Sequence, residues 1–137
     1  MIVATADSNI YVSALQFGGI PLQCLNAARA GAFQLVISEA IIAEVHGVLQ
    51  EKFRWSKAML NEAMASLRDF TQLVTPAQTL HVIKEDPDDD RVIECAVASG
   101  SQFIISGDKH LLRLGLYENI RILKVAEFLN LVPSHSD

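Results

Sequence analysis

The sequence predicts an α/β domain with three layers, α/β/α, built around a mostly parallel central sheet. Short apolar runs, several of them β-branched, alternate along the chain with longer segments of helical periodicity. Strands that alternate with helices favour crossover units and a parallel sheet. The chain has 137 residues, 50% of them hydrophobic, which suffices for one domain with a sizeable core. We therefore expect one domain over residues 1–132 and a frayed tail over residues 133–137.

The overall charge excludes some classes of partner. The net charge is −5 and the sequence pI is near 5.3, so no global basic field favours nucleic acid, and a polyanionic partner needs local basic groups or metal ions. The two cysteines, Cys24 and Cys95, match no metal-ligand spacing and are expected to be reduced core residues. We find no apolar run of transmembrane length and no basic segment of a secretory signal, and we expect a cytoplasmic protein without a membrane partner.

The first strand is expected over Met1–Ala6, where apolar residues stop at Asp7. A helix then follows through Ile10–Leu15. Asp7 is either the N-cap of this helix, supported by Asn9, or a functional carboxylate at the end of the strand. A pair of glycines interrupts the pattern, and a second helix is predicted over Pro21–Gly31.

A second strand is expected over Phe33–Ile37 and ends at Ser38, a good N-cap for the next helix. That helix buries a stripe at helical spacing, which comprises Ile41, Ile42, Val45, Val48 and Leu49. Glu44 lies at the edge of the stripe. It is either an ordinary surface glutamate or a side chain that reaches over the sheet edge toward Asp7.

The next segment is the only dense run of basic and aromatic residues, and it contains Lys52, Arg54 and Trp55. It is either a linker between two helices or a nucleic-acid contact in which cations meet phosphates and the indole stacks on a base. Another amphipathic helix begins near Ser56.

The remaining elements are shorter. Residues 73–75 and 80–83 are weak strand candidates. Toward the C-terminus the pattern predicts a brief helix over Lys109–Leu114, a last strand over Arg121–Val125 and a helical turn over Ala126–Leu131.

The segment Glu85–Asp108 is the centre of the functional interpretation. Four aspartates crowd the start of a helix that ends at Gly100: Asp86, Asp88, Asp89 and Asp90. A short strand, Phe103–Ile105, follows, and Asp108 lies just past its carboxyl end. On one interpretation Asp88 caps the helix and the other acids form a solvated face. On the other interpretation the acids are part of a cation site. Two acidic positions at one sheet edge repel each other unless a cation lies between them, which favours the cation site.

These motifs, taken together, resemble the PIN domain family, and the chain is most similar to its VapC-type toxin branch. The resemblance runs along nearly the whole chain and is carried by Asp7-Ser8-Asn9, Ser38…Glu44, the segment Asp86–Ala96 and the segment Ile104–Asp108. It implies a ribonuclease that prefers single-stranded RNA and uses Mg²⁺ or Mn²⁺ held by three or four acidic side chains. It also implies the toxin component of a toxin–antitoxin pair, with an antitoxin partner and a homodimer.

The resemblance also assigns residues. The family's acidic positions fall on Asp7, Glu44, Asp89 and Asp108, while Asp86, Asp88 and Asp90 stay open as alternatives to Asp89. Supporting positions, which orient a carboxylate or a metal-bound water, fall on Asn9, Ser106, Asp90 and Asp86. Candidate contacts to RNA are Lys52, Arg54, Trp55 and Lys109; His110 and Arg113 are either further contacts or ordinary neighbours.

The chemistry of such a site is intelligible from the residue types. Hydrolysis of a phosphodiester needs a nucleophile made from water and charge compensation at an anionic phosphate, and a divalent metal supplies both. Mg²⁺ and Mn²⁺ prefer carboxylate oxygens, which matches an acidic set without histidine or cysteine.

Two other classes of function stay open. One is a PIN-like module without catalytic activity that binds RNA or protein. The other is a Mg²⁺-dependent phosphoacceptor signalling domain, which needs an acidic pair at the first strand, whereas Asp7 stands alone there.

Overall fold

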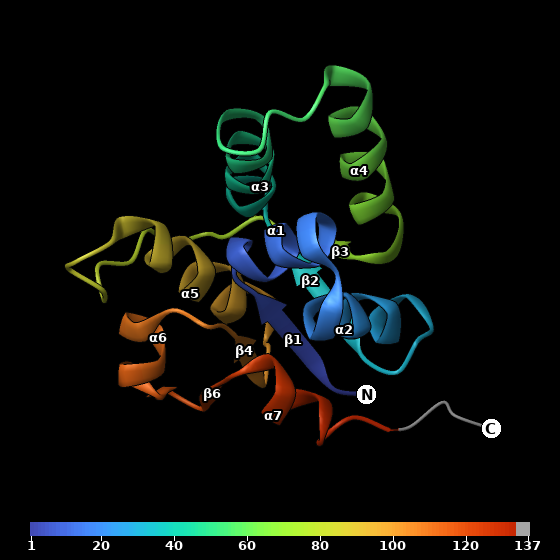
Figure 1. The fold of residues 1–137 in the computed structure, drawn as a ribbon. Coiled ribbons are helices and arrows are strands. Elements are labelled where there is room, and N and C mark those ends of the chain that lie inside the picture. Colours follow the sequence, from blue (N-terminus) through green and yellow to red (C-terminus); the bar gives the residue numbers. More distant parts are fainter. Residues whose placement is uncertain (134–137) are drawn as a thin grey trace.

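Six strands form a single sheet in the order β3-β2-β1-β4-β6-β5 in the computed structural model, which describes residues 1–133 (Figure 1). Every neighbouring pair is parallel except β5 and β6, which are antiparallel. The mostly parallel sheet predicted from the sequence is therefore confirmed. The strands are β1 (Val3–Ala6), β2 (Gln34–Ile37), β3 (Gln72–Leu73), β4 (Phe103–Ile105), β5 (Leu116–Tyr117) and β6 (Ile120–Leu123).

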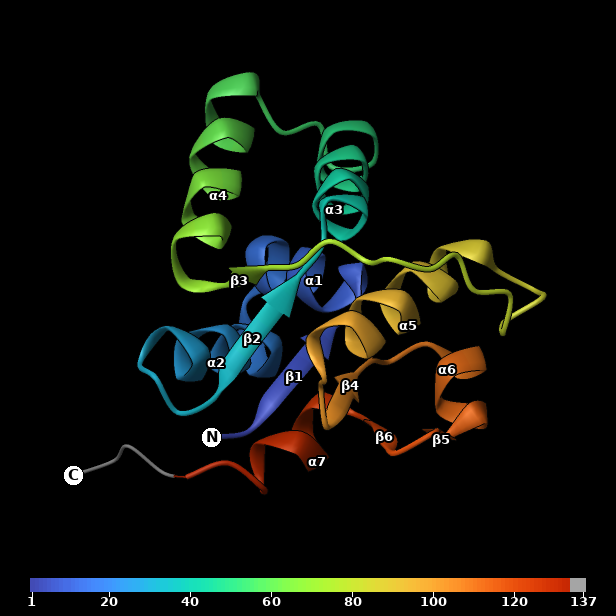
Figure 2. The same ribbon diagram turned by 180° about the vertical axis from the view of Figure 1, so that it is seen from behind.

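Helices cover both faces of the sheet, as a three-layer α/β/α domain requires. One face carries α1 (Ser8–Phe17), α2 (Gly19–Arg29) and α7 (Val125–Leu129), and the other carries α5 (Pro87–Ser99) (Figures 1 and 2). The remaining helices are α3 (Glu39–Glu51), α4 (Lys57–Phe70) and α6 (Lys109–Leu114). Helices α3 and α4 form a hairpin that extends from the carboxyl end of β2.

The strand register brings the carboxyl ends of the central strands to one edge. Thr5 of β1 pairs with Val36 of β2, and Ala6 pairs with Ile105 of β4. The residues that follow β1 and β4 therefore lie side by side, although they are about a hundred positions apart in the sequence. Helices α1, α3 and α6 begin directly after these strand ends, so this edge of the sheet collects helix N-termini.

The central strands and α5 form the core. Leu35, Ile37, Ile104 and Ile105 are completely buried, as expected for strands covered on both faces. Helix α5 is buried over most of its surface, because it crosses β1, β2 and β4. Both cysteines are buried and free, as the sequence predicts.

Several predicted boundaries differ from the structure. The second helix begins at Gly19 rather than Pro21, because Gly18 with a φ of 78° turns the chain directly from α1 into α2. The strand candidate at residues 73–75 is β3, Gln72–Leu73. The short strand β5 carries no strong strand pattern and forms only as an antiparallel partner of β6.

The strand candidate at residues 80–83 is wrong. Residues 74–86, hereafter the strap, contain neither helix nor strand and run along α5. The N–H of Leu80 donates to Glu94, and the N–H groups of Val82 and Ile83 donate to Asp90. Carboxylates of α5 thus accept the hydrogen bonds that a neighbouring strand would otherwise accept, and the apolar pattern reflects packing of an extended segment on a helix.

No helix within residues 1–133 is long and apolar enough to cross a membrane. The tail predicted over residues 133–137 lies, apart from Pro133, outside the described residues.

Candidate active site

Asp7 ends β1 and is the N-cap of α1, so both interpretations of this residue apply to the same side chain. Its Oδ1 accepts the N–H of Ile10 at 3.1 Å, and its Oδ2 accepts the hydroxyl of Ser106. The residue is 3% exposed. Burial raises the pKa of Asp7 to about 6; the Ser106 hydroxyl opposes this rise and the charge of Asp108 adds to it.

Asp108 follows β4 and is the N-cap of α6. Its Oδ2 accepts the N–H of His110 at 2.8 Å and of Leu111 at 3.1 Å, while its own N–H donates to the Ser106 hydroxyl at 2.9 Å. Burial acts to raise the pKa of Asp108, but the Leu111 N–H, the neighbouring Asp89 carboxyl and the His110 N–H outweigh it and hold the pKa below its usual value. The Ser106 hydroxyl therefore links the carboxylate of Asp7, which follows β1, to the backbone N–H of Asp108, which follows β4.

Asp89 contributes a third carboxylate from the first turn of α5. It is 7% exposed, and its Oδ2 is buried without a hydrogen-bond partner among residues 1–133. Burial raises the pKa of Asp89 to about 8, and the nearby carboxyl groups of Asp108, Asp86 and Asp7 add to this rise. A buried carboxylate oxygen that nothing satisfies is costly, and it is the group that a cation would stabilise most.

Glu44 comes from the second turn of α3, and its Oε1 accepts the hydroxyl of Ser8. Burial raises the pKa of Glu44, against the effect of the Ser8 bond, and the carboxylates of Asp88 and Asp86 raise it further. Glu44 thus reaches over the sheet edge to the residue next to Asp7, rather than lying free on the surface.

The four acids named from the sequence therefore gather at one edge of the sheet and form an acidic group that we call the carboxylate cluster: Asp7, Glu44, Asp89 and Asp108. Three of its carboxyl groups interact with one another, and Glu44 adjoins them through Ser8 and through Asp86 and Asp88 of α5. Asp7, Asp89 and Asp108 lie at the N-terminal ends of α1, α5 and α6, where the helix dipoles favour negative charge. Glu44 comes from the second turn of α3.

The donor set suits a hard divalent cation. All four members provide carboxylate oxygens, which Mg²⁺ and Mn²⁺ prefer, and the unpartnered Oδ2 of Asp89 is a free ligand atom within the cluster. In residues 1–133, however, no three acidic, histidine or cysteine side chains surround one point closely enough to form a metal centre. Oxygens of Asp7 and Asp108 instead accept hydrogen bonds from backbone N–H groups and from the Ser106 hydroxyl.

The other aspartates of α5 have different roles. Asp86 is the N-cap of α5, two positions before the cap expected at Asp88, and its Oδ1 accepts the N–H of Asp88 at 3.0 Å. Asp90 is 3% exposed and accepts the N–H groups of Val82 at 2.9 Å and Ile83 at 2.8 Å. The side chain of Asp90 therefore holds the strap, and it does not interact with the cluster carboxylates.

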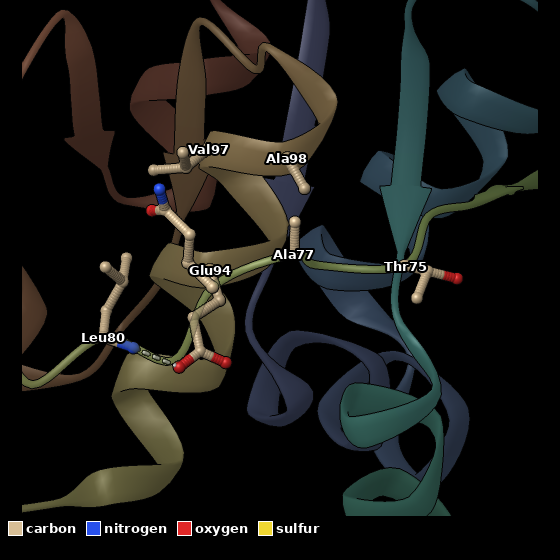
Figure 3. A pocket seen from close by; sticks show the side chains of 7 residues that line it. Thr75, Ala77, Leu80, Glu94, Val97 and Ala98 are labelled. Atoms are coloured by element: carbon tan, nitrogen blue, oxygen red, sulfur yellow. Dashed lines mark hydrogen bonds between the residues drawn. The ribbon is translucent and has the colours of Figure 1, made fainter.

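Glu94 holds the same strap one helical turn further along α5. Its Oε2 accepts the N–H of Leu80 at 2.7 Å, the bond drawn in Figure 3, and the guanidinium of Arg91 at 2.8 Å. Glu94 is not among the site residues predicted from the sequence. The spacing of Asp90 and Glu94 by four residues places both side chains on one side of α5, and this spacing is the signal that predicts a shared polar contact.

The basic and aromatic run lies apart from the cluster. Lys52 follows Glu44 by eight residues, about 12 Å along the axis of α3. Trp55 is half-buried, and its Nε1 donates to Gln16 Oε1 at 2.7 Å, so the indole fastens the α3–α4 turn to α1. Arg54 is exposed. Lys109, by contrast, is exposed directly next to Asp108.

Ser8 is a site residue that the sequence analysis did not assign. Its hydroxyl donates to Glu44 and it is 4% exposed, whereas Asn9, proposed for a supporting role, is exposed and has no side-chain hydrogen bond within the described residues. The available signal was its position: a hydroxyl next to a strand-end carboxylate, at the start of a helix.

The fold and the carboxylate cluster first define a class of protein: three-layer α/β/α domains with an acidic site at the carboxyl edge of a parallel sheet. Residues 4–110 match the model of the PIN domain family, and the chain therefore belongs to this family. The comparison with curated protein sequences gave no match.

Solved structures with the same fold include three Vap proteins. A chain of VapBC2 from Rickettsia felis, solved with a DNA fragment from the promoter, has a TM-score of 0.65 at 13% identity and covers 90% of this chain and 98% of that chain. A chain of VapBC-1 from nontypeable Haemophilus influenzae has a TM-score of 0.65 at 13% identity and covers 91% of this chain and 99% of that chain. Mycobacterium tuberculosis VapC20, described as a toxin that cleaves the sarcin-ricin loop, has a TM-score of 0.59 at 12% identity and covers 86% of this chain and 98% of that chain.

Proposed function

We propose that this protein is a metal-dependent endoribonuclease and that Asp7, Glu44, Asp89 and Asp108 bind its Mg²⁺ or Mn²⁺. The observation that carries the proposal is the buried Oδ2 of Asp89, which lacks a partner beside two further carboxylates. Membership of the PIN domain family and the fold shared with VapC20, an RNA-cleaving toxin, support the same conclusion.

The reaction joins a water oxygen to phosphorus, breaks the bond from phosphorus to a ribose oxygen and returns a proton to that oxygen. A bound divalent cation lowers the pKa of water and neutralises charge at the phosphate. The carboxylates of the cluster would hold such a cation, and the hydroxyls of Ser8 and Ser106 orient Glu44 and Asp7. Exposed Lys109 contacts the RNA backbone next to Asp108, and Lys52 and Arg54, which lie farther from the cluster, contact more distant phosphates of a longer RNA.

The test is cleavage of single-stranded RNA with Mn²⁺ or Mg²⁺, and with EDTA. Asp7→Asn and Asp108→Asn should lower the rate by roughly a hundredfold or more, because each removes a metal ligand without changing side-chain size. Asp69→Asn, an exposed acid on α4, is the matched control and should retain wild-type activity. Cleavage that persists in EDTA, or in both cluster variants, contradicts the proposal. Absence of cleavage with either metal favours a binding module without catalytic activity.

We further propose that the protein is the toxin of a toxin–antitoxin pair. The support is the shared fold with chains of two VapBC structures and with a toxin, VapC20. Induced expression in a bacterial host should arrest growth, and Asp7→Asn should abolish the arrest. A small protein that copurifies and restores growth identifies the antitoxin. A homodimer stays a prediction, which light scattering of the purified protein tests.

A further inference from the structure

A cavity of about 250 Å³ lies between the strap and α6, beside the carboxylate cluster. It is lined by Ile83, Glu85, His110, Arg113 and Leu114. Asp90, the residue after Asp89, holds one wall by accepting the Ile83 N–H, and Asp108 holds the other by accepting the His110 N–H. Both walls are thus attached to the elements that position the cluster.

The lining combines three kinds of group. Ile83 and Leu114 provide apolar side chains, and Arg113 provides an exposed guanidinium that forms no ion pair within residues 1–133. His110 Nδ1 is buried without a hydrogen-bond partner in the same part of the chain, 3.8 Å from Glu85 Oε2. The apolar wall complements the base of a nucleotide, and the exposed cation complements its phosphate.

Exposed cations stand at this cavity although the whole chain is acidic. The lining holds Arg113 together with the carboxylate of Glu85, and exposed Lys84 and Lys109 adjoin the lining, as Asp86 does. The cavity on the other side of the strap has a similar volume, about 250 Å³, but its lining contains Glu94 and no cation (Figure 3). The two hollows have similar volumes, but only the first has a cation in its lining and adjoins the cluster.

We propose that the cavity between the strap and α6 binds one nucleotide of the RNA, next to the scissile phosphate. The base packs on Ile83 and Leu114, and Arg113 contacts the adjoining phosphate. Pockets for drug-sized ligands begin at roughly 300 Å³, so 250 Å³ suits a smaller group such as a single base. The inference rests on the proposed function and adds to it the site that selects the nucleotide beside the cleaved bond.

The test compares two variants of the cavity with two matched controls. Leu114→Trp fills the cavity without a change of charge, and Arg113→Glu reverses the charge at its mouth. Ala98→Trp places the same bulk in the other cavity. Arg121→Glu makes the same charge reversal in β6, where Arg121 pairs with Phe103 at the start of β4, the end of the sheet opposite to the cluster. Affinity for a short fluorescent single-stranded RNA is measured in Ca²⁺, and thermal unfolding checks that each variant is folded.

Both cavity variants should weaken RNA binding by roughly tenfold or more, since burial of the base against apolar side chains and a phosphate contact each contribute on this scale. Both controls should bind like wild type. RNA with 4-thiouridine should crosslink to residues 81–85 or 110–114, and Leu114→Trp should remove this crosslink. Wild-type affinity in both cavity variants, equal losses in the controls, or crosslinks confined to other segments overturn the inference. A cavity that receives a side chain of a protein partner leaves RNA affinity unchanged in all four variants.

The two proposals fail in different ways. If wild type binds RNA but cleaves none, while the cavity variants still lose affinity, the proposed nuclease fails and the nucleotide site stands. If wild type cleaves RNA with Mn²⁺ and the cavity variants match its affinity and KM, the nucleotide site fails and the nuclease stands.

Discussion

At the scale of single residues, the carboxylate cluster is a place where burial works against charge. Asp7 and Asp89 are almost completely buried, and burial raises the pKa of Asp7 to about 6 and of Asp89 to about 8. Ionisation of either carboxyl group therefore lowers the free energy of unfolding. A cation that binds the cluster removes this cost, so stability and metal binding are linked.

The first prediction concerns Asp7. Its folded pKa of about 6 lies above the unfolded value of about 3.9, so the folded protein binds more protons between these values. The free energy of unfolding of the metal-free protein should therefore fall as the pH rises from about 4 to about 6 and should change little through Asp7 above that range. Asp7→Asn removes this contribution and should stabilise the metal-free protein at pH 7 by at most about 3 kcal/mol.

Urea unfolding in EDTA, at several pH values, measures this effect. Asp69→Asn serves as the exposed control. The assignment of a buried carboxyl group with a raised pKa to this position is contradicted if Asp7→Asn is less stable than wild type. It is also contradicted if the free energy of unfolding of Asp7→Asn has the same pH dependence as that of wild type.

The second prediction concerns Ser8. Removal of its hydroxyl in Ser8→Ala releases Glu44, and RNA cleavage should fall by roughly 10- to 100-fold, as is typical when a group that orients a metal ligand is lost. Ser8→Thr keeps the hydroxyl and should restore most of the activity. The affinity for Mn²⁺, measured by calorimetry, should fall in Ser8→Ala as well; equal loss in both variants points instead to disturbed packing of α1.

At the scale of elements, α5 performs two tasks with adjacent residues. Asp89 faces the cluster, whereas Asp90 and, one turn later, Glu94 face the strap and accept its backbone N–H groups. The helical turn of about 100° between neighbours separates the two directions. The strap thereby becomes the wall of the proposed nucleotide site without joining the sheet.

The third prediction concerns Asp90. Asp90→Ala leaves the N–H groups of Val82 and Ile83 without their acceptor in a partly buried position, and it should destabilise the fold by about 1–3 kcal/mol. Hydrogen exchange should show faster exchange of these two amides. Asp90→Asn keeps an acceptor oxygen and should be much milder, and Glu62→Ala on α4 is the exposed control. Unchanged exchange in Asp90→Ala contradicts the role given to this side chain.

At the scale of the whole molecule, the proposed function requires an acidic chain to bind RNA, which is itself a polyanion. With a net charge of −5, long-range attraction for RNA is absent, and the cluster itself repels phosphate. Local cations beside the cluster and bound divalent metal are the means by which the proposed function overcomes this repulsion. RNA affinity should therefore depend more on divalent metal than on the general charge of the surface.

The fourth prediction follows from this balance. Replacing Ca²⁺ with EDTA at constant ionic strength should lower the affinity for single-stranded RNA by roughly tenfold or more, because the repulsion between the cluster and phosphate is then uncompensated. Asp108→Asn removes part of the repulsion and should bind RNA in EDTA more tightly than wild type does. Equal affinity of wild type in Ca²⁺ and in EDTA contradicts this account.

The sequence by itself determined the alternation of strands and helices and the mostly parallel sheet, apart from the strand wrongly expected at residues 80–83 and the unexpected β5, and it placed Asp7 and Asp108 at strand ends. Hydrophobic periodicity and strand-end carboxylates are local properties, and parallel strands necessarily bring their carboxyl ends together. The cap at Asp86 rather than Asp88, by contrast, depends on how the strap enters α5.

Only the tertiary structure decided which aspartate faces which partner. Asp89 and Asp90 are identical in type and adjacent in sequence, and their different roles arise because α5 packs with one side toward β4 and another toward the strap. The position of Trp55 against Gln16 and the cavity between Ile83 and Leu114 likewise join segments far apart in the chain. Such contacts depend on the rotation of packed helices about their axes, which a pattern along one segment does not specify.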